Sequence, residues 1–247
     1  MRAMELKKPR PSVIFDHDGT VIDSLAMVVA ASNAAVVERG AAPGTRARIV
    51  ADMVYHTPER MGRLSGIDDH GAREAMAERF YELAATEFLD LARPYPAFPA
   101  ALQELVDRGV AVGIVSNNRG SLIRRLLCRY DLAEYFTVVY GEDDVVEKKP
   151  AAAAALQAVC ALGSSVDRCV FVGDSAPDVR CAEAAGMSAI GVEWGTTSRD
   201  ELLAHGFSRV VGSARELLDA ILDAIGADAR SSGSTSGRVY RFAAQGE

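Results

Sequence analysis

Short apolar stretches alternate with helix-like stretches through the second half of this 247-residue chain, and this alternation constrains the fold more than any other feature. Apolar runs at residues 110–115, 136–140, 169–172 and 187–192 lack the polar alternation of a half-exposed strand, so we predict strands buried on both faces. An earlier apolar run at 12–15 supplies one more strand. We predict helices between these strands at residues 100–108, 120–130, 151–162 and 177–185. This order predicts an α/β fold with a Rossmann-like parallel-sheet core and helices on both faces.

The region that follows the first strand has a different pattern. Apolar residues recur at helical spacing over residues 24–40, and residues 46–91 contain two or three further helical stretches with no convincing strand. We therefore predict a small all-helical cap at residues 24–92, inserted after the first strand. The core is then made of two pieces, residues 1–23 and 93–226.

Composition narrows the partners of the chain. The net charge of −7, from 27 basic and 34 acidic residues, argues against a nucleic-acid-binding surface. No apolar stretch approaches the ~20 residues that span a membrane, so we expect no membrane partner. The four cysteines are too far apart for zinc-binding pairs and fit reduced thiols, which favours the cytoplasm. Residues 227–247 are rich in Ser, Gly and Arg, so we expect a disordered tail there.

Polar clusters follow the predicted strands, where parallel sheets place their ligand sites. Asp16 and Asp18 come directly after the first strand. Two carboxylates two residues apart can supply a nucleophile and an acid/base. The alternative is a polar turn, for which Asp18 and Gly19 alone would suffice.

The next two clusters have the chemistry of phosphate binding. Ser116 and Asn117 follow the strand at 110–115, and a hydroxyl with loop N–H groups there can donate to a phosphate oxygen. The alternative is a simple helix cap. Lys148 and Lys149 come before a helix, where an ammonium group can neutralise a phosphate. Exposed lysines are usually just solvated, but only four lysines occur in the whole chain.

The last cluster consists of Asp174 and Asp178, four residues apart where a strand gives way to a helix. Carboxylates are the ligands that hard divalent cations prefer, and one of them can also orient a lysine. The alternative is a helix N-cap at Asp174 or Ser175, a role that is compatible with metal binding.

These four clusters, in this order, resemble the motifs of the haloacid dehalogenase superfamily, in the branch of phosphoglycolate-phosphatase-like and β-phosphoglucomutase-like proteins with a helical cap. The matching segments are residues 15–24, 114–117, 149–150 and 173–178. Residues 191–195 and 201–203 are similar to the final strand and loop of phosphoglycolate-phosphatase-like members.

The resemblance implies a role for each cluster. Asp16 attacks phosphorus and forms an aspartyl-phosphate, and Asp18 protonates the leaving alcohol and then deprotonates the attacking water. Mg²⁺ is the implied cofactor, with the ligands Asp16, Asp18 through its main-chain carbonyl, Asp174 and Asp178. The implied phosphate-binding residues are Ser116, Asn117, Lys149 and Thr20.

The function implied is a Mg²⁺-dependent phosphatase acting on a small phosphorylated metabolite, either phosphoglycolate-like or a sugar phosphate, as a monomer or homodimer. A sugar phosphomutase and a catalytically silent binding protein on the same fold remain alternatives. Asp18 argues against the dehalogenases of the superfamily, which lack that residue. Phosphonate hydrolysis is disfavoured because residues 24–92 contain no lysine for a Schiff base. One or two cap arginines are candidates to bind a second anionic group of the substrate, among Arg46, Arg48, Arg60, Arg63, Arg73 and Arg79.

Overall fold

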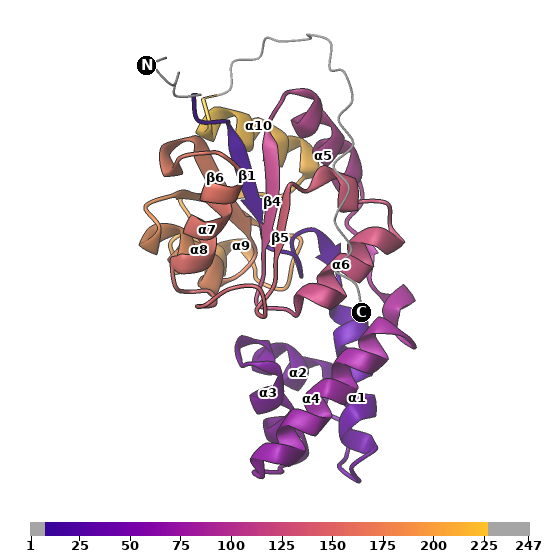
Figure 1. Cartoon of the computed structure of the whole chain (residues 1–247). Coiled ribbons are helices and arrows are strands. Elements are labelled where there is room, and N and C mark those ends of the chain that lie inside the picture. Colours follow the sequence, from indigo (N-terminus) through magenta and orange to yellow (C-terminus); the bar gives the residue numbers. More distant parts are fainter. Residues whose placement is uncertain (1–7, 227–247) are drawn as a thin grey trace, which may run out of the picture.

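The computed structural model describes residues 8–226, and within them six parallel strands form the central sheet in the order β5-β4-β1-β6-β7-β8 (Figure 1). The strands are β1 (Ser12–Phe15), β4 (Ala111–Val115), β5 (Val138–Tyr140), β6 (Cys169–Gly173), β7 (Ser188–Val192) and β8 (Arg209–Val211). The chain builds outward from β1 to β4 and β5, then crosses to the other side of β1 for β6. The direction of strand addition therefore reverses at β1, which is where ligand sites of open parallel sheets lie.

Helices cover both faces of the sheet because neighbouring residues of each strand point to opposite sides. Val13 and Phe15 pack in the cluster that contains α5 (Phe98–Asp107), α6 (Gly120–Arg129) and α10 (Ala214–Ala224). Ile14 packs on the opposite face. The helices of that face are α7 (Ala153–Ala161), α8 (Ala176–Ala184) and α9 (Arg199–His205). A layer of helices on each face of the parallel sheet confirms the predicted fold class.

The last part of the core differs from the sequence expectation. Residues 201–203, compared above with a terminal strand and loop, lie inside α9, and the last strand among residues 8–226 is β8. Sequence signals for α9 and α10 were present: Ser198 and Ser213 each accept a hydrogen bond from the N–H of a glutamate three residues later, Glu201 and Glu216. The predicted tail at 227–247 lies outside the described residues.

Four helices form the region that follows β1. They are α1 (Leu25–Val37), α2 (Arg46–Ala51), α3 (Thr57–Ser65) and α4 (His70–Ala85), with 3₁₀ turns at Asp52–Val54 and Leu89–Leu91. The chain enters this cap through β2 (Ile22–Asp23) and returns through β3 (Arg93–Pro94), and the two pair antiparallel. Figure 1 shows the cap beyond the carboxyl ends of the sheet strands. The cap therefore faces the edge of the sheet at which the polar clusters lie.

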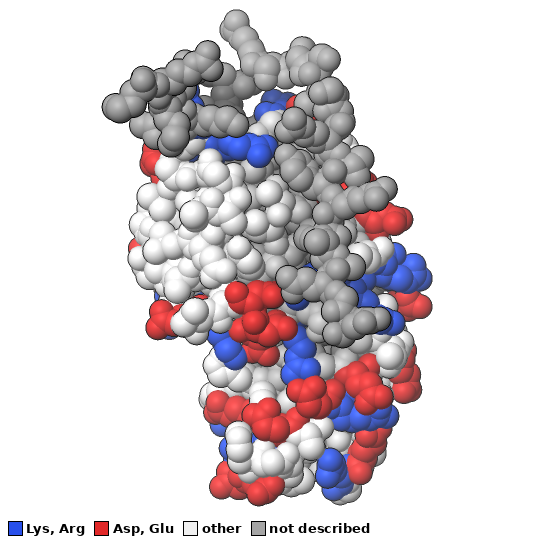
Figure 2. Space-filling view, viewed as in Figure 1, with Lys and Arg blue, Asp and Glu red and all other residues white. Residues whose placement is uncertain are grey.

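The cap surface mixes charges of both signs. Figure 2 shows basic and acidic side chains next to one another over these helices. Arg79 pairs with both Glu38 and Glu82, and Arg119 of the core bonds to Glu78 of the cap at 2.6 and 2.7 Å. Among the described residues, no helix has the length and apolar character needed to cross a membrane.

Candidate active site

A cavity of about 530 Å³ lies between the cap and the carboxyl ends of the strands. Its wall includes six of the eight predicted site residues: Asp16, Asp18, Ser116, Asn117, Lys149 and Asp174. Asp178 lies behind this wall, fully buried. Thr20 does not reach the cavity. The site is therefore assembled from the ends of β1, β4 and β6 and from the loop that precedes α7.

The loop after β1 determines which of its side chains reach the cavity. The Asp16 N–H donates to the Val172 carbonyl at 2.8 Å, which anchors the end of β1 to β6. The chain then turns at Gly19, with φ +79°, and the N–H groups of Val21 and Ile22 both donate to the His17 carbonyl. This turn directs Thr20 into the interior, where its side chain is fully buried. The prediction that Thr20 binds phosphate is therefore not supported by its position.

Lys149 connects two of the carboxylates. Its Nζ lies 2.7 Å from Asp16 Oδ1 and donates to Asp178 Oδ1 at 2.6 Å. Burial alone would lower the pKa of Lys149, but the two carboxylates raise it above its ordinary value, so the side chain is an ammonium ion. Burial raises the pKa of Asp16 to about 6, although the ammonium opposes that rise.

Asp178 holds Lys149 rather than facing the cavity. Its second oxygen, Oδ2, accepts from the Ser175 N–H at 3.0 Å and from the Ser175 hydroxyl at 2.5 Å, at the start of α8. Both carboxylate oxygens are therefore engaged within the protein. Two roles were predicted for Asp178, metal ligation and orientation of the lysine. Its hydrogen bond to Lys149 directly supports the second role.

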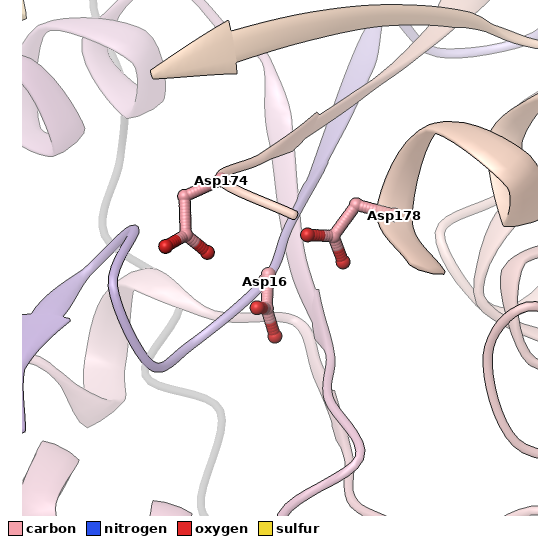
Figure 3. Close-up of side chains that lie close together, drawn as sticks. All are labelled: Asp16, Asp174 and Asp178. Atoms are coloured by element: carbon pink, nitrogen blue, oxygen red, sulfur yellow. The ribbon is translucent and has the colours of Figure 1, made fainter. Parts of the chain in front are cut away.

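Asp174 projects from the end of β6 toward Asp16 (Figure 3). Its Oδ2 accepts from the Thr196 N–H at 3.2 Å, and two glycines, Gly19 and Gly195, lie so close that a Cβ on either would overlap the carboxylate. Burial and the neighbouring carboxylates raise the pKa of Asp174 well above its ordinary value. The glycines thus make the space that this buried carboxylate occupies.

The donor set fits a divalent cation. Oxygens of Asp16, Asp174 and Asp178 all lie within 4.8 Å of one another, with all three residues buried. Lys149 neutralises only one of these three carboxylates, and buried charges of one sign are costly without a partner. Mg²⁺ takes carboxylate oxygens in such sites. Since the oxygens of Asp178 are already bonded, Asp16 and Asp174 are the carboxylates free to ligate it.

Asp18 has a different environment from Asp16. Asn118 Nδ2 donates to its Oδ2 at 2.8 Å, and His17 Nδ1 lies 3.3 Å from the same oxygen. Burial would raise the pKa of Asp18, but His17, Ser24 and Asn118 together lower it below its ordinary value. The sequence expectation gave Asn118 and His17 no role in the site. Their position directly beside Asn117 and Asp18 was the available signal.

Ser116 and Asn117 have separate tasks. Ser116 is buried at the end of β4, where its N–H donates to the Tyr140 carbonyl at 3.0 Å and its Oγ accepts from the Asn118 N–H at 3.2 Å. The hydroxyl hydrogen of Ser116 remains free for a ligand at the cavity wall. The Asn117 side chain instead exchanges two hydrogen bonds with the Lys149 backbone, at 2.8 and 3.0 Å. It therefore fixes the lysine loop, a task that the sequence expectation did not assign to it.

Comparison with known proteins places this site in a family. The model of haloacid dehalogenase-like hydrolases matches residues 13–192, which include every residue of the site described above except those after β7. A phosphoglycolate phosphatase of Photorhabdus laumondii is 28% identical over 226 residues, covering 89% of this chain and 95% of that protein. A phosphoglycolate phosphatase of Neisseria meningitidis is 32% identical over 190 residues, covering 74% of this chain and 80% of the relative.

Solved structures share the fold. A hydrolase from Pseudomonas syringae superposes with a TM-score of 0.75 at 23% identity, covering 87% of this chain and 99% of that one. A haloacid dehalogenase-like family hydrolase from Streptococcus pneumoniae has a TM-score of 0.72 at 17% identity and covers 85% of this chain and 98% of its own. At these identities the structures support the arrangement of sheet and cap, and the sequence relatives carry the family assignment.

Proposed function

Because this chain belongs to the haloacid dehalogenase-like hydrolase family and is a phosphoric monoester hydrolase, we propose that it is a Mg²⁺-dependent phosphatase of small phosphomonoesters that works through an aspartyl-phosphate. One observation carries the proposal. Asp16 contacts Lys149 at 2.7 Å, belongs to the carboxylate cluster with Asp174, and shares one cavity with Asp18. A nucleophile, a fixed positive charge, a metal site and an acid/base are thus brought together at the end of β1.

In the first step a carboxylate oxygen of Asp16 attacks phosphorus, the P–O bond to the alcohol breaks, and Asp18 gives its proton to the departing oxygen. This role requires a protonated Asp18 in the enzyme–substrate complex. Negative phosphoryl oxygens beside Asp18 favour that state, because a like charge raises the pKa of a carboxyl group.

In the second step a water molecule attacks the phosphorus of the aspartyl-phosphate. Asp18, now a carboxylate, accepts the proton of that water, the bond between phosphorus and Asp16 breaks, and inorganic phosphate leaves. Because its pKa is lowered, Asp18 is already a carboxylate in the free protein, which is the form that the second step needs. Asn118 and His17 keep it on the cavity side of the loop.

Charge stabilisation in both steps comes from groups already fixed in place. Lys149, held by Asp178, faces the oxygens that gain negative charge, and the Ser116 hydroxyl can donate to a phosphoryl oxygen. When bound at Asp16 and Asp174, Mg²⁺ supplies the remaining positive charge that phosphoryl transfer requires. The Asp18 main-chain carbonyl is the third protein ligand that we assign.

The test is release of inorganic phosphate from a panel of phosphometabolites, which includes phosphoglycolate because relatives are named for it, and sugar phosphates. We expect turnover with Mg²⁺, loss of turnover in excess chelator, and recovery when Mg²⁺ is restored. Turnover that persists in excess chelator contradicts the metal site. Isomerisation of a sugar phosphate without net phosphate release contradicts the hydrolase and supports a mutase.

A further inference from the structure

Arg60 is a buried arginine in the cap that has no hydrogen-bond or ion-pair partner among the described residues. It lies in the first half of α3, its residue exposure is only 6%, and its Nε is shielded from solvent without a hydrogen bond. Within residues 8–226 its guanidinium also makes no ion pair. A buried charge without a partner is costly, and proteins rarely retain one.

Four other cap arginines have the acidic partner that Arg60 lacks among the described residues. Arg63, one turn later on the same helix, donates to Asp52 at 2.9 Å, and Arg48 donates to the same carboxylate at 3.2 Å. Arg73 pairs with Asp68 and Arg79 with Glu38. Each of these arginines has an acidic partner, although each is more exposed to water than Arg60.

The position of Arg60 suggests what its partner is. Arg60 lines the same 530 Å³ cavity as Asp16, Ser116 and Lys149, from the cap side. Its guanidinium carbon lies 4.7 Å from the centre of the Phe80 ring, which supports the flat face of the group and leaves its edge for hydrogen bonds. The core side of the cavity holds the phosphoryl-transfer groups, so Arg60 faces the other end of any substrate.

We propose that Arg60 binds an anionic group on the alcohol portion of the substrate, and so selects phosphomonoesters that carry a carboxylate or a second phosphate. This inference rests on the proposed phosphatase function. The guanidinium fork offers two parallel N–H donors, which match the two oxygens of a carboxylate or of a phosphate. Burial makes that pairing stronger than on an exposed surface, because water competes less for the donors.

The test compares substrates that differ only in this group. Phosphoglycolate carries a carboxylate, 2-hydroxyethyl phosphate is its neutral counterpart, and 1,2-ethanediol bisphosphate carries a second phosphate instead. We expect the wild type to favour an anionic substrate over the neutral one in kcat/KM. The stronger of the two anionic substrates identifies the group that Arg60 binds.

The variants are Arg60→Met, which keeps the buried stem without charge, and Arg60→Lys, which keeps charge without the fork. Arg60→Met should lower kcat/KM for the favoured anionic substrate by about 30- to 100-fold, the range for hydrogen bonds to charged groups. Its effect on 2-hydroxyethyl phosphate should be under about threefold. Arg60→Lys should fall between. Arg39→Gln removes an exposed cap charge outside the cavity and should leave all three substrates unchanged.

Thermal unfolding separates this role from a structural one. Since Arg60→Met removes an unpaired buried charge, its Tm without substrate should equal or exceed that of the wild type. Equal losses on charged and neutral substrates, or a wild type with no preference for an anionic one, overturn the inference and leave the phosphatase proposal standing. A wild type that hydrolyses none of the three compounds with Mg²⁺, nor any other phosphomonoester, overturns both.

Discussion

The core wall and the cap wall of the cavity differ in whether their buried charged side chains have partners within the protein. On the core wall the charged side chains of the site have hydrogen-bond partners within the protein. Lys149 donates to Asp178, Asp18 accepts from Asn118, and Asp174 accepts from the backbone N–H of Thr196. On the cap wall the buried Arg60 has no partner among the described residues. These side chains of the core wall are therefore fixed before substrate binds, as the proposed phosphoryl-transfer chemistry requires. On the cap wall, the charge of Arg60 is left for an anionic group of the substrate to pair with, as proposed above.

The largest effect is expected at the core nucleophile. Asp16→Asn keeps the shape of the side chain and removes the attacking oxygen anion, so kcat should fall by at least about a hundredfold. Steady-state kinetics with Mg²⁺ measure it, and Asp219→Asn on α10, which is exposed and ion-paired with Arg215, is the matched control. Retention of more than about a hundredth of the wild-type rate would remove Asp16 from the mechanism.

The adjacent lysines provide the next comparison. Lys149→Met should lower kcat by about a hundredfold or more, because a preorganised charge at the reacting phosphoryl group is lost. The metal-free variant should also lose about 3–5 kcal/mol of stability, since buried carboxylates remain unpaired. Lys148→Met removes a half-buried lysine that pairs with Glu142 at 2.6 Å, and its effect on both quantities should be small. Similar losses from both variants would show that the Lys149 contacts have no special role.

A glycine tests the metal site without changing a charge. Gly195→Ala places a methyl group against the Asp174 carboxylate, and the backbone there has no positive φ that would forbid alanine. We expect the Mg²⁺ concentration for half-maximal activity to rise about tenfold, as for displaced supports of metal ligands. Gly71→Ala in α4, where a Cβ meets only Asp69 at 3.5 Å, should leave the metal requirement unchanged. If the Mg²⁺ requirement is unchanged in both variants, Asp174 is not a ligand of the metal.

The smallest effect concerns stability and pH. The folded-state pKa of Asp16 is raised to about 6, and that of Asp174 is raised as well. Both groups bind protons more tightly when folded, so the metal-free protein should lose their contribution as pH rises from about 4 to about 6. Above this window we expect Mg²⁺ to replace the protons on these carboxylates. The increase in Tm on adding Mg²⁺ should be larger at pH 7.5 than at pH 5. An increase that is equal at both pH values would contradict metal binding at these carboxylates.

The same contrast between core and cap explains what could be predicted from the sequence. The strand β1 was predicted with its observed bounds, and β4, β6 and β7 within one residue at each end, because apolar runs that must be buried on both faces have few alternatives. Asp16, Lys149 and Asp174 follow from strand ends that meet at one edge. The location of Thr20 and the tasks of Asn117 depend on the turn at Gly19 and on side-chain hydrogen bonds between loops, which spacing along the chain does not reveal. In the cap, six arginines were equal candidates in the sequence, and Arg60 differs from the other five because the fold buries it without giving it a partner among the described residues.

The most direct test of the account is the mass of the Asp18→Asn protein during turnover of an aryl phosphate. An aryl leaving group needs little protonation, so Asp16 can still attack, while hydrolysis of the aspartyl-phosphate lacks its base. We predict a species heavier by one phosphoryl group that accumulates in this variant and is absent from the double variant Asp16→Asn, Asp18→Asn. If Asp18→Asn instead hydrolyses alkyl and aryl phosphates at the wild-type rate with no such species, Asp18 is not the acid/base and the proposed mechanism is wrong.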